Sequence, residues 1–208
     1  MKNSNCDFSP LKEQLIKALK DVSIEIDTGL KSLEKDNFCL LGKLAMIKEN
    51  FEKAEAMAAS FYLNCYLSPF TDMYLDISNA LQHLSHQKHG ALIVIEREDS
   101  VDSIIRSGTP MGAKLTHSLL ESIFYPGNPL HDGAVIVRSN QILSAANVLP
   151  LSSIFVGEKK LGTRHRAAIG LSERSDALII VVSEETGRVS FAMDGELHPI
   201  ITTSSSII

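Results

Sequence analysis

Hydrophobic residues recur at helical spacing over the first third of the chain. A first stripe has members three or four positions apart: Leu11, Leu15, Leu19, Val22 and Ile26. Residues at this spacing share one face of a helix. Ser9 and Pro10 favour a helix start, because Ser caps free N–H groups and Pro fits the first turn. The segment Asp27–Gly29 predicts the end of this helix, since glycine commonly follows a helix end.

A second stripe with the same spacing follows and predicts a helical hairpin. Its members are Leu40, Leu44, Ile47, Phe51, Ala54 and Ala58. Each helix then has one narrow apolar face, and residues 1–67 are too few to enclose a core of their own. The hairpin must therefore pack on the rest of the chain or on another subunit. It is either a plain N-terminal extension of the fold or an element for oligomerisation and control.

Beyond Ser68 and Pro69 the pattern changes to short, strongly apolar segments. The predicted strands are Ala91–Ile95, Ala134–Val137, Ile142–Val148, Ala177–Val182 and Val189–Met193. Segments this apolar are usually covered on both faces of a sheet. Further helices are predicted at Phe70–His89, Ser100–Ile105, Leu115–Phe124 and Thr163–Leu171.

Two short turns indicate that part of the sheet is antiparallel. Ser139–Gln141 and Glu185–Gly187 are each short enough to join neighbouring strands as hairpins. We therefore expect an α/β fold with a mixed, partly antiparallel central sheet flanked by helices. This domain, residues 68–208, is preceded by the N-terminal helical hairpin, residues 1–67.

Composition narrows the class of protein. The chain has 208 residues, a formal charge of -5 and a pI of about 5.8. It lacks the distributed cationic face that non-specific nucleic-acid binding needs. No apolar run approaches the roughly 18 to 20 residues of a membrane span, and the polar N-terminus does not resemble a secretory signal. We expect a cytoplasmic protein with no membrane segment and no direct nucleic-acid binding. Cys6, Cys39 and Cys65 have neither zinc nor disulfide spacing, which favours buried or incidental thiols.

Two polar motifs stand out against this apolar background. Gly162–Arg166 places two guanidinium groups around an imidazole, and each guanidinium presents paired donors that match phosphate oxygens. Leu130–Ala134 carries a histidine, a carboxylate and a glycine just before a strand. Taken alone, the first motif is also typical of a solvated helix start, and the second of an ordinary turn. Together they indicate chemistry on a nucleotide.

Six segments, in this order, resemble the diadenylate cyclase domain over about residues 85 to 195. They are Gly90–Arg97, Pro129–Ala134, Leu149–Ser152, Gly162–Ala168, Ser172–Ala177 and Val182–Gly187. Each is weak by itself, but six in register are specific. That family condenses two ATP molecules into cyclic di-AMP and two pyrophosphates. The N-terminal helices are similar to those of its sporulation-type members, so the resemblance implies a homo-oligomer, such as a hexamer, whose activity these helices restrain.

The resemblance implies a role for each catalytic motif. Asp132 would orient the attacking ribose 3′-hydroxyl and take its proton, or share a metal ion that lowers the pKa of that hydroxyl. Gly133 would allow a close approach of the backbone. Arg164, His165 and Arg166 would hold the triphosphate and offset the charge on the leaving pyrophosphate.

The resemblance also implies contacts to ATP and to a metal ion. Residues expected at the nucleotide are Leu149, Gly162, Thr163, Ser183 and Glu184. The expected ligands of Mg or Mn, with Co as a third candidate, are His131, Asp132 and Glu185. His131 is equally compatible with a structural role, and Ser183–Glu185 with a plain acidic turn. Gly108–Pro110 and Asn128 are expected only to shape loops.

The symmetry of the product bears on the assembly. One site supplies one 3′-hydroxyl and one α-phosphate, so closing a two-fold ring requires two subunits face to face. Two other functions stay open. The same fold could hold ATP or cyclic di-AMP as a regulatory ligand without turnover. A general phosphate- or RNA-binding protein is favoured by Arg164–Arg166 alone, but the acidic pI and the scarcity of aromatic residues oppose it.

Overall fold

The computed structural model describes residues 9–33, 40–153 and 161–200. Its N-terminal region is a hairpin of two long helices, α1 (Ser9–Leu33) and α2 (Leu40–Leu67), as predicted. The predicted stop at Asp27–Gly29 is wrong, because α1 continues through it. Gly29 is buried, and a Cβ there would lie 3.7 Å from Cδ1 of Leu40 in α2. Packing between the helices offsets the low helix propensity of glycine, about 1 kcal/mol.

The region after α2 is built on one seven-stranded sheet with the order β2-β4-β3-β1-β5-β6-β7. Its strands are β1 (Ala91–Ile95), β2 (Thr109–Lys114), β3 (Ala134–Arg138), β4 (Gln141–Asn147), β5 (Leu178–Val182), β6 (Val189–Met193) and β7 (Glu196–Ile200). β1 and β3 are parallel, and the other neighbouring pairs are antiparallel. The expected mixed sheet is confirmed, including the two hairpins β3–β4 and β5–β6.

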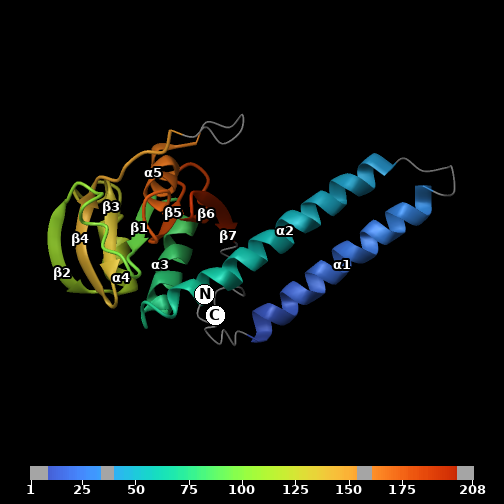
Figure 1. Cartoon of the computed structure of the whole chain (residues 1–208), viewed down its shortest axis with the longest axis horizontal. Coiled ribbons are helices and arrows are strands. Elements are labelled where there is room, and N and C mark those ends of the chain that lie inside the picture. The colour runs from blue at the N-terminus through green and yellow to red at the C-terminus, as the bar shows by residue number, and fades with distance from the viewer. Residues whose placement is uncertain (1–8, 34–39, 154–160, 201–208) are drawn as a thin grey trace.

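Helices cover both faces of this sheet (Figure 1). α3 (Tyr74–Gln87), α4 (His117–Ile123) and the end of α2 share a core with one face, and α5 (Thr163–Ser172) packs on the other. β1 is buried along its whole length, because Ile93 faces the first core while Leu92 and Val94 face the second. The apolar strand pattern therefore reports burial on both faces, as expected.

Two strands, β2 and β7, escaped prediction because they are the edges of the sheet. β2 is mostly exposed and contains Pro110 and Gly112, and β7 contains Pro199. Edge strands tolerate such residues because one side forms no ladder of hydrogen bonds. Gly108–Pro110 was expected to shape a loop only. Thr109 and Pro110 instead begin β2, so that expectation is wrong for these two residues.

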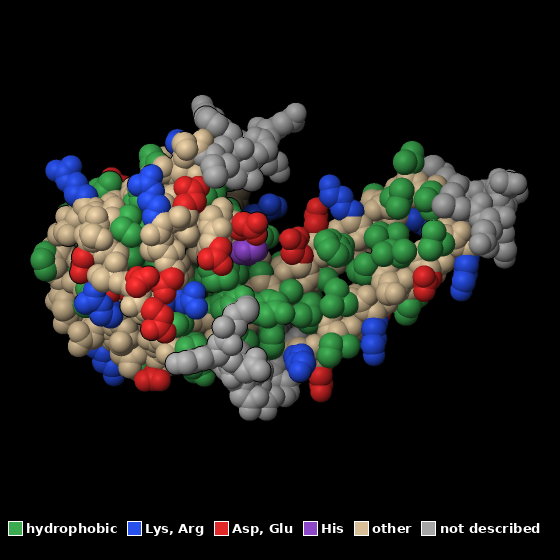
Figure 2. Space-filling model, in the orientation of Figure 1, with side chains coloured by type: hydrophobic (Ala, Val, Ile, Leu, Met, Phe, Trp, Pro, Cys, Tyr) green, Lys and Arg blue, Asp and Glu red, His purple; other side chains and the backbone are tan. Residues whose placement is uncertain are grey.

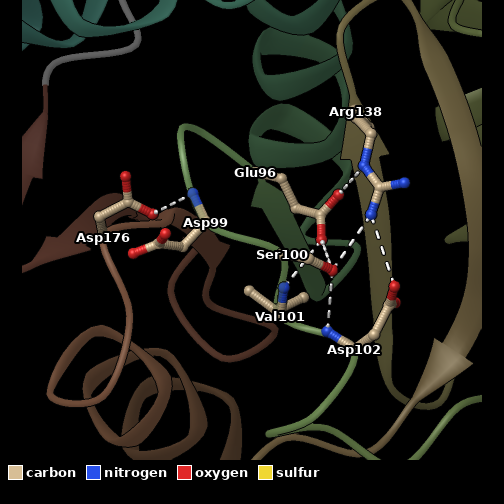
Figure 3. Close-up of polar contacts among 7 residues, drawn as sticks. All are labelled: Glu96, Asp99, Ser100, Val101, Asp102, Arg138 and Asp176. Atoms are coloured by element: carbon tan, nitrogen blue, oxygen red, sulfur yellow. Dashed lines mark hydrogen bonds and ion pairs between the residues drawn. The ribbon is translucent and has the colours of Figure 1, made fainter.

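The predicted helix at Ser100–Ile105 is also wrong, since the segment forms turns. Two of its N–H groups bond to side chains, that of Val101 to Glu96 and that of Asp102 to the Ser100 hydroxyl (Figure 3). Buried Glu96 accepts hydrogen bonds from the backbone N–H of Val101 at 2.9 Å and from the Ser100 hydroxyl at 3.3 Å, and it pairs with Arg138. Just before this segment, the carboxylate of Asp176 accepts hydrogen bonds from the backbone N–H groups of Glu98 and Asp99. Side-chain acceptors of this kind compete with helical bonding.

The helical hairpin joins the sheet through the last turns of α2. Ala59, Leu63 and Leu67 belong to the main core, and the Tyr66 ring meets Phe191 edge-on at 6.3 Å. The rest of the hairpin projects away from the sheet (Figure 1). Among the described residues, no helix combines the length and the apolarity that a membrane span needs.

The prediction that the cysteines are buried or incidental thiols is wrong for Cys65. This buried residue of α2 is disulfide-bonded. Cys6 and Cys39 lie outside the described residues. Spacing along the sequence misses a disulfide because its formation depends on the distance between two Cα atoms in space.

Candidate active site

The predicted site residues lie at one end of the central strands of the sheet. β1 runs parallel to β3 and antiparallel to β5, so the starts of β1 and β3 lie beside the end of β5. Asp132 and Gly133 directly precede β3, and Ser183–Glu185 directly follow β5. Thr163 begins α5. Arg164 in the first turn of this helix donates a hydrogen bond to Glu184, which follows β5. Segments far apart in the sequence thus supply one site.

The turn before β3 requires glycine at its second position. Gly133 has a φ of +119°, which side chains rarely adopt. A Cβ there would lie 2.8 Å from the backbone carbon of Ala146 and from the carbonyl oxygen of Asn147. Asp132, immediately before it, is exposed at the surface. The carboxylate of Asp132 is therefore carried by a tightly packed turn.

His131 is oriented by its own loop. Its Nδ1 lies 2.5 Å from the carbonyl oxygen of Asn128, which can only accept, so in the neutral ring Nδ1 carries the proton and the lone pair lies on Nε2. Asn128 is held in turn, because its Nδ2 donates to Ser122 and its Oδ1 accepts from the N–H of Leu130. Asn128 shapes the loop as expected, and it also orients His131, which sequence reasoning missed.

Arg164 is paired with an acid. Its Nη1 donates to Oε2 of Glu184 at 2.7 Å, while 23% of the arginine side chain is exposed. Gly90 makes room for this arrangement, since a Cβ there would lie 2.5 Å from Nη1 and 2.8 Å from Cζ of Arg164. The structure brings together the two expected residues from α5 and from the end of β5, and adds Gly90 to them.

Arg166 is anchored to the segment that follows β4. Its Nη2 donates to the carbonyl oxygen of Ser152 at 3.1 Å, and the backbone N–H of Ser152 donates to the carbonyl oxygen of Arg166 at 3.0 Å. Gly170 permits this contact, because a Cβ there would collide with the backbone of Pro150 and Ser152. Leu149, expected near the adenine, is buried in the core on the α5 side. Its backbone rather than its side chain is therefore the part placed to read a base.

His165 is half-buried within the first turn of α5. Burial lowers its pKa below the ordinary value of 6.5, and nearby Arg164 lowers it further, while Glu185 acts in the opposite sense. The neutral ring is favoured at pH 7, so His165 offers a hydrogen bond to a phosphate rather than a charge. Gly162 caps the helix and Thr163 is exposed beside it, so both expected residues lie at the positive end of the helix dipole.

Ser183 mainly shapes its own turn. Its backbone N–H donates to Arg188, and its hydroxyl accepts a hydrogen bond from the backbone N–H of Thr186 at 3.3 Å. Glu185 is exposed at the same turn. This geometry is compatible both with a plain acidic turn and with the expected contacts to ATP and a metal ion.

The donors expected for a metal ion fit a site that one subunit supplies only in part. Within the described residues, no three or more His, Cys, Asp or Glu side chains group closely enough to hold a metal ion. His131 and Asp132 are adjacent, and Nε2 of His131 has a lone pair to give. Mg²⁺ is commonly held by one or two carboxylates together with substrate phosphates and water, which matches such an incomplete protein set.

Comparisons with known proteins agree along the whole chain. Residues 78–197 match the family described as DisA bacterial checkpoint controller nucleotide-binding, and residues 2–70 match the N-terminal family of diadenylate cyclase CdaS. Diadenylate cyclase CdaS from Bacillus thuringiensis (strain BMB171) is 51% identical over 91% of this chain and 94% of that protein. Cyclic di-AMP synthase CdaS from Bacillus subtilis (strain 168) is 52% identical over 94% of this chain and 96% of that protein.

A solved structure agrees as well. It is a crystal structure of a protein from Bacillus cereus described as a hypothetical membrane-spanning protein. It aligns with a TM-score of 0.77 at 50% identity, over 92% of this chain and 94% of that chain.

Proposed function

The chain belongs to the diadenylate cyclase family, and we propose that it makes cyclic di-AMP from two molecules of ATP. One observation carries the proposal. The Asp132 turn precedes β3, and the end of β5 and the first turn of α5 are joined by the Arg164–Glu184 pair, so all three lie at the same end of the central strands β1, β3 and β5. The high identity to diadenylate cyclases over nearly the full chain supports it. We place the enzyme in the cytoplasm, where ATP is made and used.

The chemistry is an in-line displacement at phosphorus. The ribose 3′-oxygen of one ATP bonds to the α-phosphorus of the other, the bond from that phosphorus to the bridging oxygen breaks, and pyrophosphate leaves with its electron pair. Asp132 orients the 3′-hydroxyl and accepts its proton. Its exposed position on a rigid turn suits a group that must reach a substrate held by a second subunit.

The phosphates are bound at the start of α5. The N–H groups of the first turn, around Gly162 and Thr163, and the dipole of the helix favour an anion there. Arg164 offsets the charge that builds on the leaving pyrophosphate, and neutral His165 donates a hydrogen bond. Arg166, bonded to Ser152, fixes the distance between α5 and the segment beside the adenine.

His131, Asp132 and Glu185 would hold the divalent metal, for which Mg and Mn are the first candidates and Co the third. When bound, the ion neutralises phosphate charge and lowers the pKa of the attacking hydroxyl.

Two subunits act together. Each presents one ATP, and two identical displacements across a two-fold axis close the ring. The active unit is therefore a face-to-face dimer, held within a larger homo-oligomer such as a hexamer, and the α1–α2 hairpin restrains its activity. An isolated subunit is inactive.

The test is incubation of the full chain with ATP and Mg or Mn, with products resolved by mass. We expect cyclic di-AMP and pyrophosphate from the wild type, and a fall in rate of at least about 100-fold for Asp132→Asn, which keeps size but loses the base. ATP binding by calorimetry is the companion measurement. Binding without product in any metal would contradict the cyclase and favour a regulatory ATP-binding module.

A further inference from the structure

β4 carries a strained residue directly against the Asp132–Gly133 turn. Ala146 has a φ of +56°, a left-handed conformation that costs a non-glycine residue on the order of 1 kcal/mol. The pairing of β3 with β4 shifts register next to it, between Ala134 and Ile136. Bulges of this kind are over-represented beside active sites, where they redirect the chain.

The strained backbone fills the space that Gly133 leaves open. A Cβ on Gly133 would lie 2.9 Å from Cα of Ala146 and 2.8 Å from the carbonyl oxygen of Asn147. The turn that presents Asp132 therefore rests on the backbone of these two residues. A shift of the bulge would move the turn with it.

Asn147 locks the bulge in place. It is 1% exposed, and its side chain joins three segments. Its Nδ2 donates to the carbonyl oxygen of Ala134 at 2.8 Å, and its Oδ1 accepts from the N–H of Gly108 at 2.8 Å and from the hydroxyl of Ser144 at 3.0 Å. Ala134 directly follows Gly133, so this amide fixes the end of the catalytic turn. A buried amide with all of these bonds satisfied holds a single geometry.

The same stretch of chain also reaches the phosphate side of the site. Val148 forms a two-bond bridge with Arg106, and Ser152 bonds to both the backbone and the guanidinium of Arg166. Residues 146–152 thus contact the turn of Asp132 at one end and α5 at the other. Their conformation sets the separation of the two halves of the site.

We infer that Ala146 and Asn147 are positioning residues that hold Asp132 in register with the phosphate-binding turn of α5. The inference rests on the proposed cyclase function. In this role the strained alanine and the buried amide keep Asp132 in the position from which it orients the attacking hydroxyl. A misplacement of a catalytic group by about 1 Å can lower the rate roughly 100-fold.

The test compares Asn147→Ala with Ser172→Ala in the full chain. Ser172 is the last residue of α5 and is 3% exposed, and its hydroxyl accepts a hydrogen bond from the N–H of Gly195. Ser172→Ala therefore removes a buried side-chain hydrogen bond at the end of α5 that lies away from the site. Both variants are assayed well below their melting temperatures. We expect kcat of Asn147→Ala to fall about 10- to 100-fold with KM for ATP within about threefold, because Arg164 and Arg166 keep their contacts. We expect kcat of Ser172→Ala to stay within about twofold.

Asn147→Ser is the second variant, because it keeps a polar group but is too short to reach all three partners. A fall in kcat with unchanged KM in either folded Asn147 variant supports the inference. Equal losses in the Ser172 and Asn147 variants, or an unchanged kcat at position 147, would overturn it. Failure of both Asn147 variants to fold would also overturn it, by assigning the amide to the fold alone. Absence of product from the wild type would instead reject the cyclase function itself.

Discussion

At the scale of the residue, the positive charge of the site is held in place before any substrate arrives. Arg164 is bonded to Glu184, and the missing side chain of Gly90 provides the space for its guanidinium. A paired arginine is preorganised, because a single geometry is selected before binding. Under the proposed function, Glu184 would act on ATP through Arg164 as well as by its own expected contact.

Gly90→Ala should weaken ATP binding without harming the fold. The added Cβ meets the end of a flexible arginine side chain, so Arg164 moves while the backbone stays. We expect KM for ATP to rise about tenfold or more, the scale of one hydrogen bond to a charged group, and the melting temperature to change little. Steady-state kinetics and a thermal melt measure both quantities.

Gly42→Ala is the matched control, because a Cβ there has no heavy atom within 4 Å and the position lies in α2, far along the chain from the site. Its KM should equal that of the wild type. If Gly90→Ala kept the wild-type KM, the assignment of Arg164 to the triphosphate would be contradicted.

The residues proposed to carry the chemistry could be picked out from the sequence, whereas the residues that contact and position them could not. Asp132 and Arg164 belong to short local motifs whose residue types already indicate a nucleotide site. Gly90, Asn147 and Ser152 act through contacts with segments far away in the sequence, and nothing in their neighbours reveals those contacts. The only available signal for Asn147 was a polar residue at the end of an apolar strand.

At the scale of the element, α3 and α4 are linked by a carboxylate. Oδ1 of Asp76 accepts from the backbone N–H of His117 at 3.0 Å and from its Nδ1 at 3.1 Å. A second pair, His83 with Glu121, lies alongside. The N–H of His117 is the main cause that lowers the pKa of Asp76 below its ordinary value of 3.8.

The link should give the protein an acid-sensitive contribution to stability. Because the pKa of Asp76 is lower in the folded chain, the unfolded chain binds more protons between the two values, and stability falls as the pH drops below about 3.8. We expect Asp76→Asn to melt below the wild type at pH 7, and the gap to narrow as the pH falls towards 3. Thermal melts across this range measure it.

Asp21→Asn on α1 serves as the control, since Asp21 is exposed on the projecting hairpin. Its melting temperature should follow that of the wild type at every pH. A gap for Asp76→Asn that stayed constant down to pH 3 would show that the lowered pKa makes no contribution to stability.

Helices and strands could be predicted from the sequence where burial produces a clear apolar pattern. β1 and β5 are apolar along their lengths because both faces are covered, and such segments can be recognised. The edge strands β2 and β7 have no such pattern. The turns after Glu96 resemble a helix in sequence, but Glu96 accepts from Ser100 and Val101, and the distant Asp176 accepts from the N–H groups just before them.

At the scale of the whole molecule, the projecting hairpin presents apolar side chains that are exposed among the described residues (Figure 2). Of the predicted apolar stripe of α1, Val22 is buried, whereas Leu19 and Ile26 are 48% and 45% exposed, and Leu30 beyond it is 58% exposed. These three share one side of the helix at spacings of seven and four. Exposed apolar stripes of this kind are typical of protein–protein contacts.

The placement of α2 also guides how the hairpin should be tested. Leu63 and Leu67 lie in the main core, so a truncation at the proposed boundary before Ser68 would open that core. Substitutions on α1 avoid the problem, because its exposed stripe lies away from the sheet. The combined variant Leu19→Glu with Ile26→Glu places two charges on the stripe and leaves Val22 in its buried contact.

We expect this double variant to form a smaller assembly by light scattering and to turn over ATP faster per subunit, because separating the hairpins releases the restraint on the catalytic faces. Gln14→Glu, an exposed polar position on the opposite side of the same helix, adds charge away from the stripe and should match the wild type in both measurements. A smaller assembly with slower turnover would mean that the hairpin helps to form the active dimer. Unchanged mass and rate would mean that the stripe serves neither assembly nor restraint.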